Sequence, residues 1–142
     1  MTSYYLIVPY FFDGPVNAAS YSAMLGMWLI PQLRDRGLVD DVWLQLDGAP
    51  THFTLSVHDI LNKRFPGRWI GHGSLTSPAP LPWPPHSPDL TTPDNSLWGI
   101  IKGRVAARHN NNEDLRRAVE THLFVYPASK CTYGFTGHVT KA

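Results

Sequence analysis

The chain has 142 residues, of which 43% are hydrophobic and 16% are charged, and its formal net charge is +1. This composition is sufficient for a packed core, predicts one domain or part of one, and is unlike that of a disordered chain. The near-neutral charge argues neither for nor against nucleic acid, although complete DNA-binding domains are usually more basic. The lone Cys131 excludes an internal disulfide framework. The apolar runs are shorter than the roughly 18 residues of a transmembrane helix, so we expect no membrane span.

The first third of the chain predicts strands followed by a long helix. Residues 4–12 are rich in aromatic and β-branched side chains and contain a proline, which predicts two short strands or one edge strand. Asn17 is a suitable cap for a helix that runs to about Arg36. Pro31 is expected to kink this helix, and Gly37 occupies the position of a C-terminal glycine.

The middle of the chain predicts a buried strand, a helix and a second short strand. Residues 42–46 are almost wholly apolar, the pattern of a strand covered on both faces. After a turn, Thr51 is expected to cap a helix that ends near Arg64. Residues 69–70 indicate another short strand.

A long proline-rich segment follows, with seven prolines in residues 78–93. A rigid connector is the simpler interpretation, and a polyproline ligand is the alternative.

The last third predicts two helices. The first starts at Pro93, and its apolar stripe is expected to pack on the sheet. The second spans about residues 112–123, and the tail from Tyr126 onward is expected to be irregular. We find no internal repeat and no domain boundary. The alternation of strands and helices along the whole chain predicts an α/β layered fold.

Two acidic residues stand in settings that suit metal chemistry. Asp47 follows the buried strand, at the edge where ligands gather in open α/β sheets. Asp94 lies in the first turn of the helix from Pro93, where the helix dipole stabilises a carboxylate. Two carboxylates at one rim repel each other unless a cation lies between them, and Mg²⁺ or Mn²⁺ suits oxygen ligands. Two such ions can activate an attacking hydroxyl and stabilise the leaving oxygen of a phosphodiester. A turn residue and a helix cap are the simpler interpretation.

These residues belong to two longer motifs. Residues 45–53 (Gln-Leu-Asp-Gly-Ala-Pro-Thr-His-Phe) resemble the second-aspartate motif of mariner-like transposases. Residues 83–94 (Trp-Pro-Pro-His-Ser-Pro-Asp-Leu-Thr-Thr-Pro-Asp), which continue into residues 97–102, resemble the third-acid motif of that family. Residues 9–14 and 29–33 resemble further segments common in its copies. The likeness extends to about residue 125.

The resemblance implies a ribonuclease H-like catalytic domain, in which an acidic triad binds divalent metal, cuts DNA at transposon ends and joins the freed hydroxyls to a target. By position, Asp47 would be the second acid and Asp94 the third, both catalytic and both ligands of Mg²⁺ or Mn²⁺. Asp89 would be structural. The resemblance also implies DNA as partner, a possible homodimer in the full-length form and a nuclear location.

The chain departs from the family pattern at its start. By this resemblance we expect it to begin at about the third strand of the ribonuclease H-like fold, with no counterpart of the first acid and without the preceding helix-turn-helix DNA-binding region. Asp13 is no substitute, because it follows a different strand and is too close in sequence to Asp47. Residues 1–142 are therefore expected to be the C-terminal part of the catalytic domain, with the first two strands of a mixed, helix-flanked sheet missing. We expect the strand from Val42 to have an unpaired edge, and the chain alone to be inactive.

Three basic residues, Lys102, Arg104 and Arg108, are candidates for contacts with DNA phosphates, as are Arg116 and Arg117 in the next helix. A solvated helix face is an equally good interpretation of them. The alternative function is that of a non-catalytic host protein, derived from a transposase remnant, which binds nucleic acid or protein.

The seven histidines form no metal-binding pattern in the sequence. His52 is expected to be a packed histidine, and a role in orienting the turn at Asp47 is the alternative.

Overall fold

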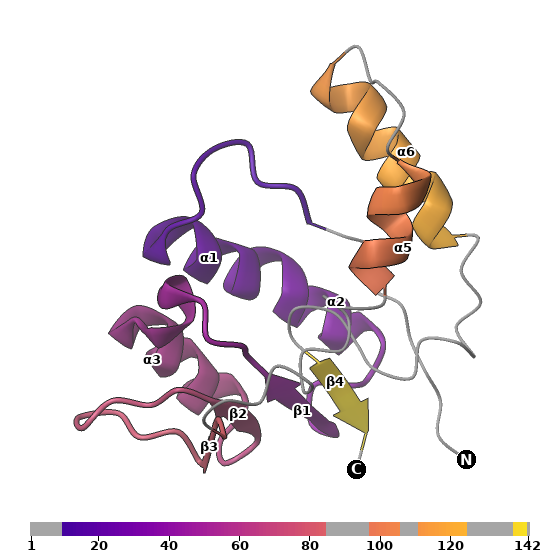
Figure 1. Cartoon of the computed structure of the whole chain (residues 1–142). Helices are drawn as coiled ribbons and strands as arrows, with labels where there is room; N and C mark the ends of the chain where they lie inside the picture. The colour runs from indigo at the N-terminus through magenta and orange to yellow at the C-terminus, as the bar shows by residue number, and fades with distance from the viewer. Residues whose placement is uncertain (1–9, 85–96, 106–110, 125–137, 142) are drawn as a thin grey trace.

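The computed structural model describes residues 10–84, 97–105, 111–124 and 138–141. Helices pack on one face of a small sheet, and a helical pair lies to one side (Figure 1). The helical elements are α1 (Ala18–Met24), η1 (Leu25–Leu29), α2 (Ile30–Asp35), η2 (Pro50–Phe53), α3 (Leu55–Arg64), α5 (Leu97–Arg104) and α6 (Asn112–Phe124). The strands are β1 (Val42–Gln45), β2 (Trp69–Gly71), β3 (Leu81–Pro82) and β4 (His138–Lys141). The predicted α/β class is confirmed at this level.

The first helical stretch forms as its sequence predicts. The Asn17 side chain accepts a hydrogen bond of 2.9 Å from the Ser20 N–H, and the Asn17 N–H donates one of 3.0 Å to the Ser20 hydroxyl. This reciprocal pair satisfies two backbone donors at the helix start. The expected kink at Pro31 takes the form of the π-helical turn η1 just before it, since proline lacks the N–H for a helical bond. Gly37, with φ of 65°, ends the stretch.

The sheet has the strand order β3-β2-β1-β4. β1 pairs with β2 in parallel, with Leu44 opposite Trp69, and β2 pairs with β3 in parallel. The parallel β1–α3–β2 unit places the carboxyl ends of β1 and β2 at the same edge of the sheet. This edge is where Asp47 leaves β1.

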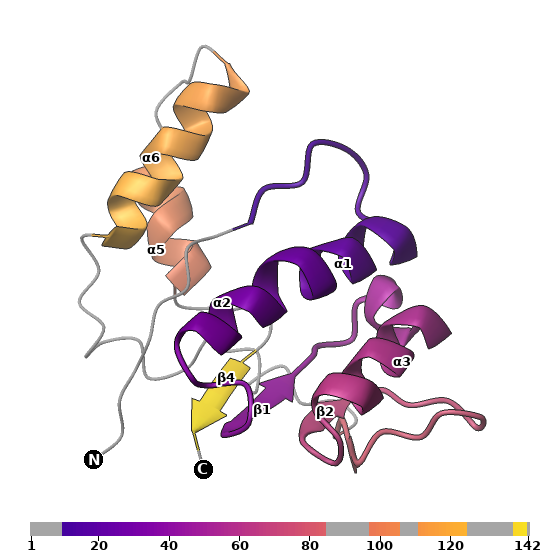
Figure 2. The same ribbon diagram turned by 180° about the vertical axis from the view of Figure 1, so that it is seen from behind.

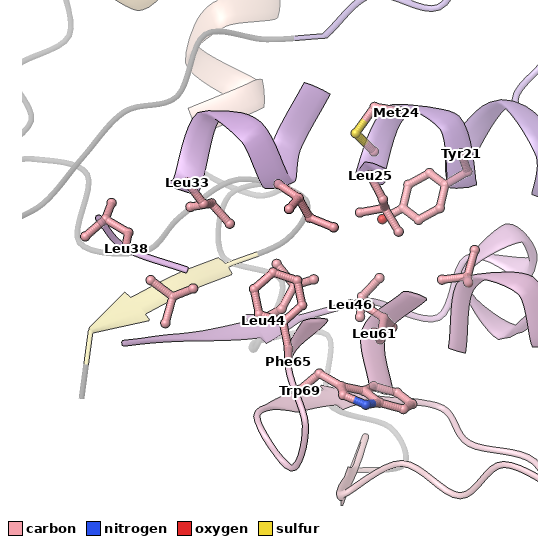
Figure 3. Close-up of a cluster of buried hydrophobic side chains, with 13 residues drawn as sticks. Tyr21, Met24, Leu25, Leu33, Leu38, Leu44, Leu46, Leu61, Phe65 and Trp69 are labelled. Carbon is pink, nitrogen blue, oxygen red and sulfur yellow. The ribbon is translucent and has the colours of Figure 1, made fainter. Parts of the chain in front are cut away.

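The core lies between the sheet and helices α1, α2 and α3 (Figure 3). Val42 and Leu44 of β1 are fully buried, whereas Trp43 and Gln45 on the opposite face are only half-buried. The prediction of a strand covered on both faces therefore holds fully for one face and partly for the other. The buried hydrophobic residues of this core are Tyr21, Met24, Leu25, Ile30, Leu33, Leu38, Val42, Leu44, Leu46, Val57, Leu61, Phe65 and Trp69.

The prediction that β1 has an unpaired edge is wrong, because β4 pairs with that edge. β4 runs antiparallel to β1, with Val139 opposite Leu44 and Lys141 opposite Val42. The irregular tail predicted from Tyr126 onward is wrong for residues 138–141. The sequence of β4 is polar apart from Val139, so it lacks the apolar pattern by which a strand is recognised.

Two local predictions are also wrong. Residues 10–12 form no strand; instead the Tyr10 ring packs on Phe12 and on Trp28 of the helical layer, with centroids 4.9 and 5.5 Å away. Residues 4–9 lie outside the described chain. The middle helix starts after Thr54 and not after Thr51, because residues 50–53 form the 3₁₀ turn η2.

The two residues of the apolar stripe of α5 whose side chains the structure describes, Ile101 and Val105, do not pack on the main core as expected. Both are buried and pack against Val119 of α6 and Phe11, in a separate small cluster. Figure 2 shows α5 and α6 side by side, away from the sheet. α6 itself is confirmed at Asn112–Phe124, close to the predicted bounds.

We predict that removal of residues 138–142 exposes the β1 edge and causes self-association, because an unpaired strand edge is a template for pairing with another chain. The free energy of unfolding should fall by about 1–3 kcal/mol. Light scattering and urea unfolding measure the two effects, with removal of Ala142 alone as the control. A shortened chain that stays monomeric and unfolds at the same urea concentration as the control would contradict the role assigned to β4.

Candidate functional site

Asp47 lies two residues beyond the end of β1, where the chain turns toward η2. The preceding Leu46 is still held to the sheet, since its N–H donates to the carbonyl of Ile70 over 2.8 Å. The position of Asp47 is therefore fixed by the strand behind it. Its side chain is 28% exposed, so solvent and ligands reach it.

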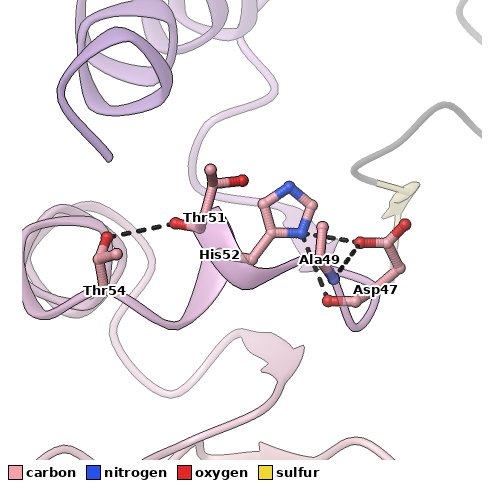
Figure 4. A network of polar contacts seen from close by, with 5 residues as sticks. All are labelled: Asp47, Ala49, Thr51, His52 and Thr54. Atoms are coloured by element: carbon pink, nitrogen blue, oxygen red, sulfur yellow. Dashed lines mark hydrogen bonds and ion pairs between the residues drawn. The ribbon is translucent and has the colours of Figure 1, made fainter. Parts of the chain in front are cut away.

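The Asp47 carboxylate is held mainly through one oxygen. Oδ1 accepts hydrogen bonds from the Ala49 N–H, over 3.0 Å, and from Nδ1 of His52, over 2.8 Å. His52 Nδ1 also lies 3.3 Å from the carbonyl oxygen of Asp47 (Figure 4). The bond to Ala49 forms an Asx turn, in which an aspartate side chain holds the backbone two residues on.

His52 is buried, with 7% of its surface exposed, and its ring stacks on Tyr21 of α1 at a centroid distance of 4.4 Å. His52 is thus a packed histidine, as expected. It also contacts the turn at Asp47, so the two roles considered for it from the sequence occur together. The sequence places Tyr21 only in the apolar stripe of its helix. No sequence signal distinguishes a tyrosine that backs a functional histidine from one that fills the core.

The electrostatics favour an ionised Asp47. The hydrogen bond from His52 lowers the pKa of the Asp47 carboxyl below its ordinary value of 3.8; partial burial opposes this shift, and the Ala49 N–H and the charge of His52 add to it. Burial raises the pKa of the Tyr21 phenol, and the nearby charge of Asp47 raises it further, so Tyr21 stays neutral. The Asp47 carboxylate is therefore ionised at neutral pH.

His72 is a second residue that the sequence did not single out. It follows β2 directly, as Asp47 closely follows the neighbouring strand β1, and its ring packs on Phe53 at a centroid distance of 4.8 Å. A side-chain carbon added at Gly48 would lie 3.7 Å from His72 Nε2. His72 thus borders the turn that carries Asp47.

Asp94, Asp89 and Arg108 lie outside the described residues, so the structure does not place them relative to Asp47. Lys102 and Arg104 are exposed on α5. Of these five residues, the structure gives positions only to the two basic ones on α5, and their exposure suits a solvated face as well as a contact with phosphate.

Asp13 and Arg116 are partners of each other. They form an ion pair across the chain, which raises the pKa of Arg116, and the Arg116 guanidinium also lies over the Phe11 ring. This pair ties α6 to residues 11–13. Asp13 and Arg116 are therefore both engaged in a contact within the chain. Arg117 lies 3.7 Å from Glu113, one helical turn away.

A hard divalent cation requires oxygen ligands, and Asp47 offers one ionised carboxylate with an oxygen directed away from its hydrogen-bond donors (Figure 4). This donor fits Mg²⁺ or Mn²⁺. Within the described ranges, no group of three or more His, Cys, Asp or Glu side chains could hold a metal ion. The described chain thus offers one candidate ligand, Asp47, and no complete metal site.

Neither a family model, nor a curated protein, nor a solved structure matches this chain. In the part of the chain that the structure describes, every helix is too short or too polar to cross a membrane.

We predict that the Asp47–His52 contact contributes stability that disappears in acid. Because folding lowers the pKa of Asp47, its contribution is fully present above the unfolded value of about 3.8 and disappears as the pH falls through the lower folded value. Replacement Asp47→Asn removes the charge but keeps an acceptor oxygen, so the variant should be less stable at neutral pH by on the order of 1 kcal/mol.

Urea unfolding of both chains from about pH 2 to about pH 7 measures this difference. The gap in the free energy of unfolding should be largest near neutral pH and should close below about pH 4. A gap that stays constant over the whole range would mean that ionised Asp47 does not stabilise the folded chain.

Proposed function

We propose that the chain is part of a mariner-like transposase and retains the later part of a ribonuclease H-like catalytic domain. The function of such a domain is metal-dependent cleavage of DNA strands and transfer of the freed ends to a target. The observation that carries the proposal is the setting of Asp47, an ionised carboxylate at the carboxyl end of a buried parallel strand with one oxygen turned away from its hydrogen-bond donors.

Three features of the fold support the proposal. The β1–α3–β2 unit is parallel, as the later strands of a ribonuclease H-like sheet require. The motif residues 45–53 form a strand end, an Asx turn and a 3₁₀ turn, and two of them, Ala49 and His52, contact the Asp47 carboxylate. The α5 helix, which follows the second motif, is present and carries exposed Lys102 and Arg104.

The metal in this proposal is Mg²⁺ or Mn²⁺, held by Asp47 and Asp94. When bound, such ions activate the attacking hydroxyl and stabilise the leaving oxygen of a phosphodiester. Asp47 contributes a fixed negative charge, and His52 and the Ala49 N–H keep its carboxylate in one orientation. We propose that residues 1–142 alone do not cleave DNA, because the triad needs a third acid besides Asp47 and Asp94.

The partners in this proposal are DNA and, in a full-length form, a second copy of the chain, in the nucleus. Lys102 and Arg104 are the DNA-contact candidates that the structure describes, and Arg108 is the third. A second function remains open, that of a non-catalytic binding protein derived from a transposase. Exposed Lys102 and Arg104 on α5 suit this alternative as well, because contacts with phosphate need no catalytic metal.

Metal binding by the full chain tests the proposal. Titration with Mn²⁺, followed by electron paramagnetic resonance of the free ion, should show weak binding that Asp47→Asn and Asp94→Asn each weaken by about tenfold or more. Asp59→Asn is the matched control, because Asp59 is an exposed carboxylate on α3 away from the motif. Mn²⁺ binding that none of the three replacements changes would contradict the proposed site.

DNA binding then separates the two functions. For the transposase, replacement of Lys102 and Arg104 by alanine should reduce the salt dependence of DNA binding by about one unit of slope for each phosphate that the chain no longer neutralises. Salt-dependent DNA binding by a chain whose two aspartates bind no metal would favour the non-catalytic protein.

A further inference from the structure

β3 is the edge strand at the end of the sheet away from β4 (Figure 1). It pairs in parallel with β2, with Leu81 opposite Ile70 and Pro82 opposite Gly71. Both residues of β3 are exposed, and among the described residues no strand pairs with its other side. An exposed edge of this kind ordinarily invites association, because its unpaired N–H and C=O groups are a template for a strand of another chain.

The residues around β3 alternate between prolines and residues that have a backbone N–H. Prolines stand at positions 78, 80, 82 and 84, and all four are exposed. The N–H of Trp83 donates to the carbonyl of Gly71 over 2.8 Å, so Trp83 directs its N–H to β2. Successive residues of an extended chain direct their backbone groups to opposite sides. The two neighbours of Trp83, Pro82 and Pro84, therefore have their backbone nitrogens on the open side of β3.

The same alternation fixes the register of β3. If the strand slipped by one residue, prolines would face β2, and the carbonyl of Gly71 would have no N–H from which to accept a hydrogen bond. The start of the segment is also fixed in place. Ala79 packs partly against the main core, and a side-chain carbon added at Gly73 would collide with the backbone of Pro78 and Ala79. The prolines are thus held on the open side.

We propose that Pro82 and Pro84 prevent a strand of a second copy from pairing with the open side of β3. Proline has no backbone N–H, so this side offers carbonyl acceptors but no donors at the two positions. A strand that paired there would bury its own carbonyls without partners, which costs free energy. Proline on an exposed edge is one of the means by which proteins avoid edge-to-edge association. The sheet is therefore closed to extension at this end.

A proline segment that is only a rigid connector makes a different prediction. If the prolines merely stiffen the chain, their replacement should loosen this segment and should leave association between chains unchanged. If they withhold donors from the edge, replacement by a residue that has an N–H and favours strands should create a new interface. Self-association of the chain distinguishes the two roles.

The experiment is sedimentation velocity of the full chain, of Pro82→Thr and of the double variant Pro82→Thr/Pro84→Thr over a range of concentrations. We expect the double variant to self-associate at least about tenfold more tightly than the wild-type chain, and Pro82→Thr to lie between them. Pro66→Thr is the first control, because it replaces an exposed proline in a turn outside the sheet. Leu81→Thr is the second control, since it places the same side chain on β3 without adding an N–H. Both controls should match the wild-type chain.

Hydrogen exchange then locates the new interface. In the double variant, the amides introduced at positions 82 and 84 should exchange at least about tenfold more slowly in the associated state than in dilute solution. Self-association equal to that of the wild-type chain in both proline variants overturns the proposal. An equal rise in either control also overturns it, because threonine itself and not the added N–H would then be the cause. If the double variant does not fold, Pro82→Thr decides by the same two measurements.

Discussion

The burial of one face of β1 is the constraint on which the rest of the structure depends. Val42 and Leu44 are fully buried and Leu46 nearly so, and each such side chain contributes about 1.5–3 kcal/mol relative to exposure. A slip of one residue would turn these side chains outward and bring Trp43 and Gln45 into the core. The register of β1 against β2 is thereby fixed, and with it the point at which the chain leaves the sheet at Asp47.

The polar contacts at that point connect the site to the helical layer. Asp47 is held by His52, and His52 is stacked on Tyr21, which belongs to the buried core. The same core that stabilises the fold therefore determines how the carboxylate is presented. Oδ1 accepts the hydrogen bonds of the turn from His52 and Ala49. A carboxylate that is ionised and partly exposed at a sheet edge suits a functional role as well as that of a turn residue.

Local patterns predicted the elements whose causes are local. Asn17, Pro31 and Gly37 marked the first helical stretch because capping, a missing N–H and a positive φ depend on single residues. The apolar run of β1 was visible for a similar reason. β4 was missed because its sequence is polar and its pairing with β1 depends on residues almost a hundred positions away. The surface on which α5 packs was predicted wrongly. An apolar stripe on a helix predicts that the stripe is buried, but it does not specify which element buries it.

The candidate site was predictable in part. The position of Asp47 after a buried strand followed from the order of residues, and so did a possible orienting role for His52. Oδ1 of Asp47 accepts hydrogen bonds from His52 Nδ1 over 2.8 Å and from the Ala49 N–H over 3.0 Å, and no sequence pattern contains these distances. Tyr21 and His72 reach the site from other elements through the tertiary fold, so their proximity could not be read from spacing.

A crystal structure of the full chain grown with Mn²⁺, with anomalous diffraction recorded at the manganese edge, tests the central claim most directly. The account predicts an anomalous peak within coordination distance of the Asp47 carboxylate. A manganese ion that binds away from Asp47 altogether would contradict it.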